Sequence, residues 1–181
     1  MAVVTASADG TTRIWDGRTA EPVREITPPI PTPAADAVVH NKDSIVRSKS
    51  VHSVAHLRSP SHSMIVVPRS DRAYLMSYSG DVLRTYARDD VQGSEFLAAV
   101  VGTSERYLFV AADDGKCIVF DIPTGKVEKI VNSFAEECGG SRRDVKGACE
   151  IGGLVCHPHR GFVGGYSSDR GQKRGLLTLW K

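Results

Sequence analysis

Short apolar runs alternate with turn residues along almost the whole chain. Runs of about 5–8 residues, rich in Val, Ile, Leu, Phe and Tyr, end in Gly, Asp, Ser or Pro, and long helical periodicity is absent. This pattern predicts an all-β protein whose strands cover residues 2–8, 11–16, 22–26, 51–57, 63–69, 73–79, 82–87, 95–102, 107–112, 116–122, 126–131, 150–156, 161–167 and 175–181. Many short strands at even spacing are typical of a sandwich, a barrel or a propeller.

An internal repeat decides between these folds. Residues 3–16 read VVTASADGTTRIWD, and residues 108–121 read LFVAADDGKCIVFD. The pair Asp9-Gly10 aligns with Asp114-Gly115, and Trp15 aligns with Phe120. A third copy contains Ser167 and Asp169, then five inserted residues, and ends at Trp180. A degenerate copy at 65–78 has Asp71 in its turn, and the alignment places Ser77 at the Trp position.

The spacing of the copies indicates a WD-type repeat. Ser77 and Phe120 are 43 positions apart, within the period of about 40–45 residues for WD repeats. The two longer intervals contain the predicted loop insertions 27–50 and 133–148. We therefore expect about three and a half blades of a seven-bladed β-propeller. The blades are a truncated one at 1–26, a degenerate one at 51–87, a regular one at 95–131 and a closing one at 150–181.

Each characteristic position of such a blade has a physical role. Gly10 and Gly115 allow positive φ in a tight turn, and Asp9 and Asp114 accept backbone hydrogen bonds there. Large third-strand side chains, predicted as Trp15, Phe120 and Trp180, fill the gap between blades. Two sets of residues each match three members of the polar network of WD-type blades: Ser7, Asp9 and Trp15, and Ser167, Asp169 and Trp180. The His of that network has no clear counterpart in this sequence.

The order of regular and degenerate blades resembles one family within this class. The chain is similar to the C-terminal half of the Smu-type WD-repeat splicing factors. The similarity covers residues 5–16, 51–57, 66–86 and 107–131, together with CHPHRGFVGGYSSD at 156–169 and the ending GLLTLWK. The loops 27–50 and 133–148 and the RGQKR segment at 170–174 depart from that pattern. The helical N-terminal region of that family is absent from this sequence.

This resemblance implies a nuclear, non-catalytic scaffold of pre-mRNA splicing. It implies spliceosomal proteins as partners, with a RED-like protein bound mainly through the absent N-terminal region, and the N-terminal half of the propeller as a further partner. The alternative is a WD-repeat substrate receptor of a ubiquitin ligase or signalling complex. Candidate partner contacts are two groups on turns: Arg69, Ser70 and Asp71, and Arg170, Lys173 and Arg174.

Other chemistries are less favoured. Cys149, Cys156, His157 and His159 have ligand side chains, but their spacing matches no known zinc finger, and no metal or cofactor is expected. The basic loops lack the interleaved aromatic residues that stack on bases, so protein-facing or solvated loops are favoured over direct RNA contact. The Pro-rich stretch Pro28 to Pro33 fits a stiff linker better than a polyproline ligand. No nucleophile elbow, phosphate-binding loop or zinc-protease motif occurs.

Composition adds little beyond these expectations. The chain has 181 residues, 41% of them hydrophobic, and a net charge of +2, so charge alone does not favour nucleic-acid binding. The first residues lack the pattern of a signal peptide. Four cysteines in a chain of this length are too few for a disulfide scaffold, and we expect reduced thiols in an intracellular protein.

Overall fold

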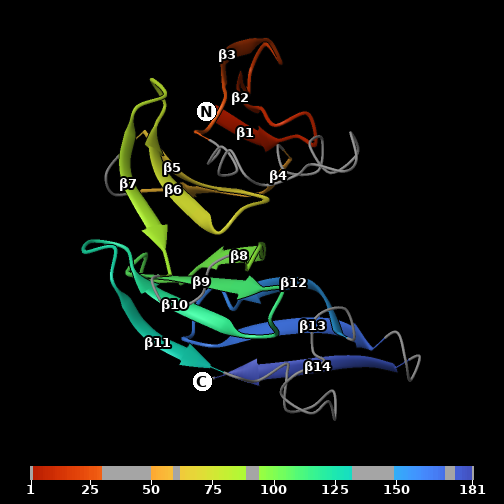
Figure 1. Ribbon diagram of the computed structural model, residues 1–181. Helices are drawn as coiled ribbons and strands as arrows, with labels where there is room; N and C mark the ends of the chain where they lie inside the picture. The colour runs from red at the N-terminus through yellow and green to blue at the C-terminus, as the bar shows by residue number, and fades with distance from the viewer. Residues whose placement is uncertain are drawn as a thin grey trace, which may run out of the picture. The chain divides into compact units, whose positions relative to one another are not determined.

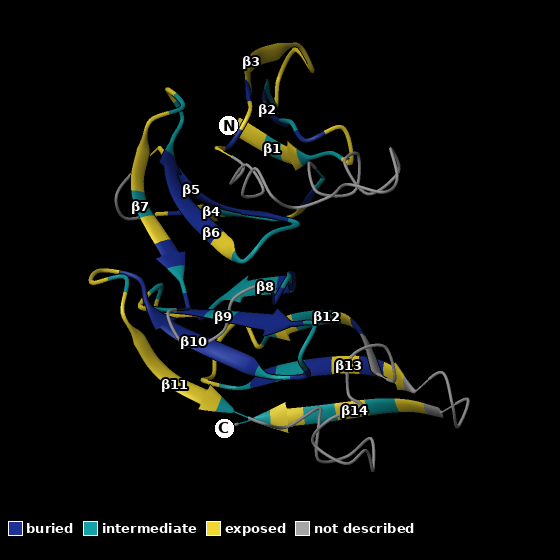
Figure 2. Ribbon diagram, in the orientation of Figure 1, coloured by how far each residue is buried: buried dark blue, intermediate teal, exposed yellow. Residues whose placement is uncertain are grey.

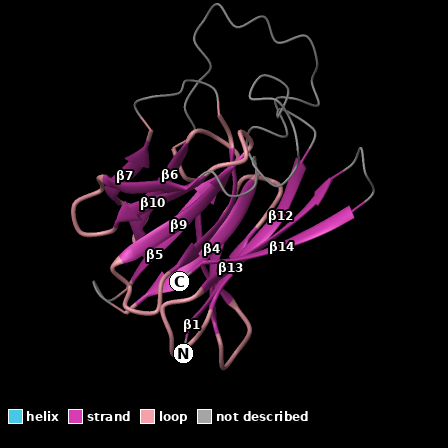
Figure 3. Ribbon diagram, turned by 90° about the horizontal axis from the view of Figure 1, so that it is seen from below, coloured by secondary structure: helices cyan, strands magenta, loops and turns pink. Residues whose placement is uncertain are grey.

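The chain folds into antiparallel β-sheets. The computed structural model describes residues 2–29, 50–58, 62–88, 94–131, 149–169 and 174–180, and of Cys149, Glu150, Asp169 and Arg174 it describes only the backbone. The described residues form fourteen strands in four sheets, and none of them is helical (Figures 1 and 3). Every strand pairs antiparallel with its sequence neighbour, so each sheet is a simple meander. The all-β class predicted from the sequence is confirmed.

The chain divides into two compact units, Met1–Ala87 and Arg88–Lys181. The first unit contains a three-stranded and a four-stranded sheet, each with its strands in sequence order. The strands of the three-stranded sheet are β1 (Ala2–Ala6), β2 (Thr12–Asp16) and β3 (Pro22–Ile26). Those of the four-stranded sheet are β4 (Val51–Leu57), β5 (Ser63–Pro68), β6 (Arg72–Ser77) and β7 (Val82–Ala87).

The second unit also pairs a four-stranded with a three-stranded sheet. The four-stranded sheet consists of β8 (Phe96–Val101), β9 (Tyr107–Ala112), β10 (Cys117–Asp121) and β11 (Val127–Val131). The three-stranded sheet consists of β12 (Cys149–Cys156), β13 (Val163–Asp169) and β14 (Arg174–Trp180). All fourteen strands lie within two residues of the ranges expected from the hydrophobic pattern. Alternation and turn residues therefore located the strands well.

Strand register corrects one alignment of the repeat. A β-bulge interrupts the pairing of β2 with β3 between Ile14 and Trp15, and that of β10 with β11 between Val119 and Phe120. In the second sheet the same bulge falls between Leu75 and Met76. Met76, not Ser77, therefore occupies the position equivalent to Trp15 and Phe120. The second sheet therefore also carries a large side chain at this position, and the flexible thioether of Met fills a core well.

In each unit, a cluster of buried side chains joins the two sheets. In the first unit, Ile14 and Ile26 of the three-stranded sheet belong to one cluster with Met64, Val66 and Met76 of the four-stranded sheet. The third-strand residue Met76 therefore lies on the side of its sheet that faces the preceding sheet. Burying such side chains supplies the main driving force for stacking the sheets.

The second unit repeats this arrangement. Ala98, Ala111 and Cys117 of the four-stranded sheet form a cluster with Ile151, and the half-buried Trp180 packs against it. The third-strand side chain again faces the preceding sheet. Burial raises the pKa of the Cys117 thiol to about 12, so this cysteine is an unreactive core residue.

The opposite face of the sheet β12–β14 exposes apolar side chains. Leu177 is 82% exposed and Leu179 is 69% exposed, and Val155 and Tyr166 are also exposed (Figure 2). The register places Tyr166 beside Leu177, and Gly164 between Val155 and Leu179. The Tyr166 ring lies over two glycines, since a Cβ on Gly152 would come within 2.2 Å of Tyr166 Cε2. One face of this sheet is thus core, and the other is an apolar surface that no described residue covers.

Candidate functional site

The two Asp-Gly turns have the same backbone geometry. Ser7 N–H donates to Thr11 O and Gly10 N–H to Ser7 O, and the equivalent bonds link Ala112 with Lys116 and Gly115 with Ala112. Gly10 has a φ of 91° and Gly115 a φ of 77°. These values lie in the region that favours glycine, as the sequence predicted for both positions.

The turn aspartates hold these loops through their carboxylates. Asp9 Oδ1 accepts the Thr11 N–H at 2.8 Å and the Thr11 hydroxyl at 2.6 Å. Asp114 Oδ1 accepts the Lys116 N–H at 3.2 Å. The bonds from Thr11, hydroxyl first and backbone second, hold the pKa of Asp9 well below its ordinary value of 3.8 because they stabilise the charged form.

Each turn carboxylate also pairs with an arginine, which lies in the same hairpin for Asp9 and in a distant segment for Asp114. Asp9 Oδ2 lies 3.1 Å from Arg13, and the pair is solvent-exposed. Asp114 Oδ2 lies 2.8 Å from Arg88, whose side chain is only 2% exposed. The buried pair ties the segment before β8 to the β9–β10 turn, and a buried pair is costly to break from one side.

The hydrogen-bond partner of Trp15 differs from the expected one. Its Nε1–H donates to Thr5 Oγ1 at 2.8 Å. Ser7, the serine matched from the sequence, instead accepts the Asp9 N–H at 3.3 Å. The reason is register: Trp15 pairs with Val3 on β1, so the side chain two residues further along the same face is Thr5.

The last copy of the repeat lacks that hydroxyl. Trp180 pairs with Val163, so the position equivalent to Thr5 is Gly165. Ser167 is buried, and its hydroxyl has no hydrogen-bond partner among the described residues. The side chain of Asp169 lies outside the described residues. Phe120, the third large residue of the series, is fully buried and meets Phe96 with ring centroids 6.1 Å apart.

The candidate contact residues of the second sheet form one polar turn. Ser70 Oγ accepts the Arg72 N–H at 3.2 Å and donates to Arg72 O at 3.1 Å, and Asp71 lies 3.5 Å from the Arg72 guanidinium. Arg69 N–H donates to Ser50 O at 2.7 Å. The structure thus places Arg69, Ser70 and Asp71 together as predicted. Of the second candidate group, Arg170 and Lys173 and the side chain of Arg174 lie outside the described residues.

Hydrogen bonds hold the Cys- and His-containing segment 156–159, at the end of β12 and the start of the β12–β13 connection. His159 N–H donates to His157 Nδ1 at 3.1 Å, and the two rings are 6.3 Å apart. Thr103 donates to His157 O at 2.8 Å and lies 3.4 Å from Cys156 Sγ. Among the residues whose side chains the structure describes, no three metal-ligating side chains gather in one place. The Cys149 side chain lies outside them.

A cavity of about 520 Å³ lies at the edge of the sheet interface in the first unit. One side is formed by the three-stranded sheet and the other by the second sheet with its β4–β5 and β6–β7 connections. The lining residues are Ala2, Ile14, Trp15, Asp16, Val23, His56, Leu57, Arg58, His62 and Tyr78. Its volume falls in the range of about 300–1,000 Å³ for ligand-sized sites.

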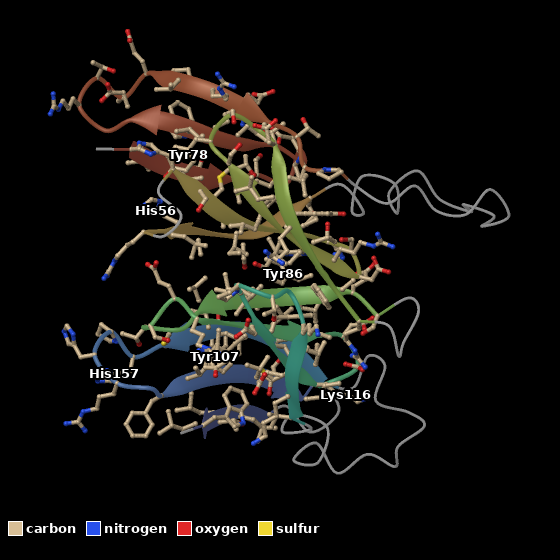
Figure 4. All side chains as sticks on the ribbon, turned by 90° about the vertical axis from the view of Figure 1, so that its left-hand side faces the viewer. His56, Tyr78, Tyr86, Tyr107, Lys116 and His157 are labelled. Carbon is tan, nitrogen blue, oxygen red and sulfur yellow. The ribbon has the colours of Figure 1, made fainter. Side chains whose placement is uncertain are left out.

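Three rings of the second sheet form one side of this cavity. The Tyr78 hydroxyl lies 2.8 Å from His56 Nδ1, and the His62 ring meets Tyr78 edge-on at 5.8 Å (Figure 4). Burial raises the pKa of Tyr78, so the phenol stays protonated. These residues could not be grouped from the sequence, because they come from β4, the β4–β5 connection and the β6–β7 connection, with a hairpin between His62 and Tyr78. The only sequence signal was an aromatic residue within the polar turn SYSGD.

No protein-family model matches this chain. Within the part of the chain that the structure describes, there is also no helix of the length and hydropathy needed to cross a membrane.

Proposed function

We propose that this chain is part of a WD-type β-propeller and acts as a non-catalytic protein-interaction scaffold in pre-mRNA splicing. The observation that carries the propeller proposal is the repeated position of the third-strand side chain. Met76 and Trp180 each belong to, or pack against, the cluster that joins their sheet to the preceding one. Propeller blades stack in this way, with a large third-strand residue between neighbours.

The matching Asp-Gly turns add independent support. Asp9-Gly10 and Asp114-Gly115 share positive φ, the same pair of backbone hydrogen bonds and an accepting carboxylate. A sandwich or barrel has no requirement to repeat one turn at equivalent positions of separate sheets.

The assignment to splicing rests on the resemblance to the Smu-type WD-repeat factors. That resemblance covers the order of the sheets, including the second sheet without Trp and the HPH segment before β13. It makes the protein nuclear, with spliceosomal proteins and a RED-like protein as partners, and with the rims of the propeller as contact surfaces.

Affinity purification of the tagged protein from cells, followed by mass spectrometry, tests this function. We expect spliceosomal proteins and a RED-like protein to co-purify, and the tagged protein to be nuclear. Recovery of ubiquitin-ligase or signalling subunits in their place, with a cytoplasmic location, would overturn the splicing assignment while leaving the propeller proposal intact.

A further inference from the structure

Each contact between the two sheets of a unit joins two different faces. In the first unit, Ile14 of the three-stranded sheet packs in one cluster with Met64 and Met76 of the second sheet. In the second unit, Trp180 of the last sheet packs against the cluster that contains Cys117 of the sheet before it. We call the side that the earlier sheet contributes a forward face, and the side that the later sheet contributes a backward face.

The forward face of the sheet β12–β14 has contact positions without a contact. Leu179 directly precedes the third-strand aromatic residue of its sheet, as Ile14 does in the first sheet. Leu177 lies three residues before that aromatic residue, as Cys117 does in the sheet β8–β11. Ile14 and Cys117 are buried against the next sheet, whereas the two leucines are largely exposed. No described residue covers this forward face.

The sheet β1–β3 shows the opposite case, a backward face without a partner. Strand pairing places Val3 beside Trp15, on the face opposite Ile14. Their equivalents in the second sheet are Met64 and Met76, which also pair and which are buried in the contact with the first sheet. Val3 is 40% exposed, and Trp15 is partly exposed. This backward face thus carries an aromatic side chain at a contact position.

One chain therefore carries the two halves of a single kind of contact. The large exposed side chains of the open forward face are uncharged, and they are Val155, Tyr166, Leu177 and Leu179. On the open backward face, Arg13 already pairs with Asp9 and Glu25. Neither face offers these neighbours an unpaired charge. A surface that complements a different surface of the same molecule produces a head-to-tail contact between copies.

The area of one such contact favours a closed pair over an open row of copies. Three strands of five residues cover about 240 Å² at the usual strand rise and spacing. A stable interface takes roughly 800 Å² from each partner. A closed pair forms the contact twice, which doubles the area per copy and gives an association that depends on concentration. Its sheets, four from each copy, also fall within the range of about 4–8 blades of a propeller.

We propose that two copies of this chain pair head to tail. The open forward face of β12–β14 in each copy lies against the open backward face of β1–β3 in the other, so that Leu179 meets Val3. The proposal rests on the proposed propeller arrangement, in which neighbouring sheets stack through these faces. It adds the partner, a second copy, and the surfaces that join the two.

A charge swap across the contact tests the pairing. Val3→Lys places a cation on the backward face, and Leu179→Glu places an anion on the forward face. Each variant alone would bury an unpaired charge in both contacts, so we expect it to stay monomeric at concentrations where the wild type pairs. In a mixture, one contact joins Lys with Glu and the other is unchanged, so the two variants should pair with each other.

Sedimentation velocity with a fluorescent label on the Val3→Lys chain measures this. Leu179→Lys, altered at the same position but with the opposite charge, is the matched control. We expect the labelled chain to bind Leu179→Glu about tenfold or more tightly than Leu179→Lys, because like charges repel across a contact. Circular dichroism checks that each variant is folded, and pairing in the mixture shows it independently.

Three results would overturn the proposal. Equal behaviour of the two mixtures would exclude a contact between these faces, including the case in which identical faces meet. A wild type that stays monomeric would exclude the pair. Assemblies that grow beyond two copies would show an open row in place of the closed pair.

The two proposals fail in different ways in cells. When two differently tagged copies are expressed together, we expect each to recover the other. Recovery of spliceosomal proteins and of chains of different sequence, but not of the second copy, would overturn the pair alone. Recovery of the second copy without spliceosomal proteins would overturn the splicing assignment alone.

Discussion

At the residue scale, a few polar side chains hold the ends of the strands. Asp9, Asp81 and Asp121 each accept hydrogen bonds from hydroxyl groups within four residues of their own position. Such local bonds satisfy backbone and side-chain groups that the sheets leave unpaired. They also explain why the carboxylates are charged in the folded protein.

The bond between Thr5 and Trp15 should contribute measurably to stability. Thr5→Val keeps the shape of the side chain but removes the acceptor, so we expect a loss of about 0.5–1 kcal/mol, small because water reaches the indole N–H. Urea unfolding of the wild type and the variant measures this difference. Thr85→Val, at an exposed position on β7, is the control, and an equal loss there would contradict a specific role for Thr5.

Acid should weaken the fold through the hydrogen-bonded carboxylates. The Thr124 hydroxyl lowers the pKa of Asp121 below its ordinary value of 3.8, and Ser79 does the same for Asp81. Because these pKa values are lower in the folded state, their stabilisation is present above 3.8 and is lost as the pH falls through the folded values.

Thermal unfolding between about pH 5 and pH 2 tests this dependence. Asp121→Asn keeps an oxygen for Thr124 but does not titrate, so its melting temperature should fall less steeply with acid than that of the wild type. Equal slopes for the two proteins would show that Asp121 does not contribute to acid unfolding.

At the scale of elements, the turns define the repeated structure of the sheets as much as the strands do. The Asp-Gly turns repeat because only one residue type suits their positive φ at low cost. A bulge repeats as well, with its extra residue on β3, β7 and β11, and it lies opposite the equivalent positions Trp15, Met76 and Phe120. The structural unit that repeats in this fold is therefore a pair of strands together with the turn that joins them.

Replacing a turn glycine with alanine should lower the free energy of unfolding, because alanine is strained at positive φ. Gly115→Ala forces a residue with Cβ into positive φ, for which we expect a loss of about 1–2 kcal/mol in the free energy of unfolding. Gly161→Ala is the matched control, since a Cβ there meets nothing within 4 Å, and should change stability by about 0.5 kcal/mol or less. Denaturant titration compares the two, and similar losses would contradict the strain argument.

At the scale of the whole molecule, the sheet β12–β14 has one apolar face that the described part of the chain does not cover. Leu177 and Leu179 are the most exposed large hydrophobic side chains of the described residues. In a complete propeller, such a face would be covered by the next blade. In the isolated chain it is a hazard for self-association.

Charging this face should keep the isolated chain monomeric. We expect the wild type to associate as its concentration rises and Leu177→Lys/Leu179→Lys to remain monomeric, because lysine pairs repel across a contact. Sedimentation velocity over a range of concentrations measures this. Val127→Lys on β11, at another exposed apolar position, should associate like the wild type, and a monomeric wild type would contradict the prediction.

The amino-acid sequence by itself determined the strands and the regular turns of this protein. Alternation of apolar residues and the Asp-Gly pairs are local properties, so the strand positions and the glycine turns at Gly10 and Gly115 could be read directly. The family resemblance and the splicing role remain predictions, since they depend on features that no part of the structure tests.

Only the tertiary structure decided which side chains meet. The bulge opposite Met76 made Met76, not Ser77, the equivalent of Trp15, and strand pairing gave Trp15 the partner Thr5 instead of Ser7. The cavity beside His56 and Tyr78 needed two connections from distant parts of the sequence to come together. Register and sheet stacking are set by the summed packing of many residues, and a linear pattern does not contain that information.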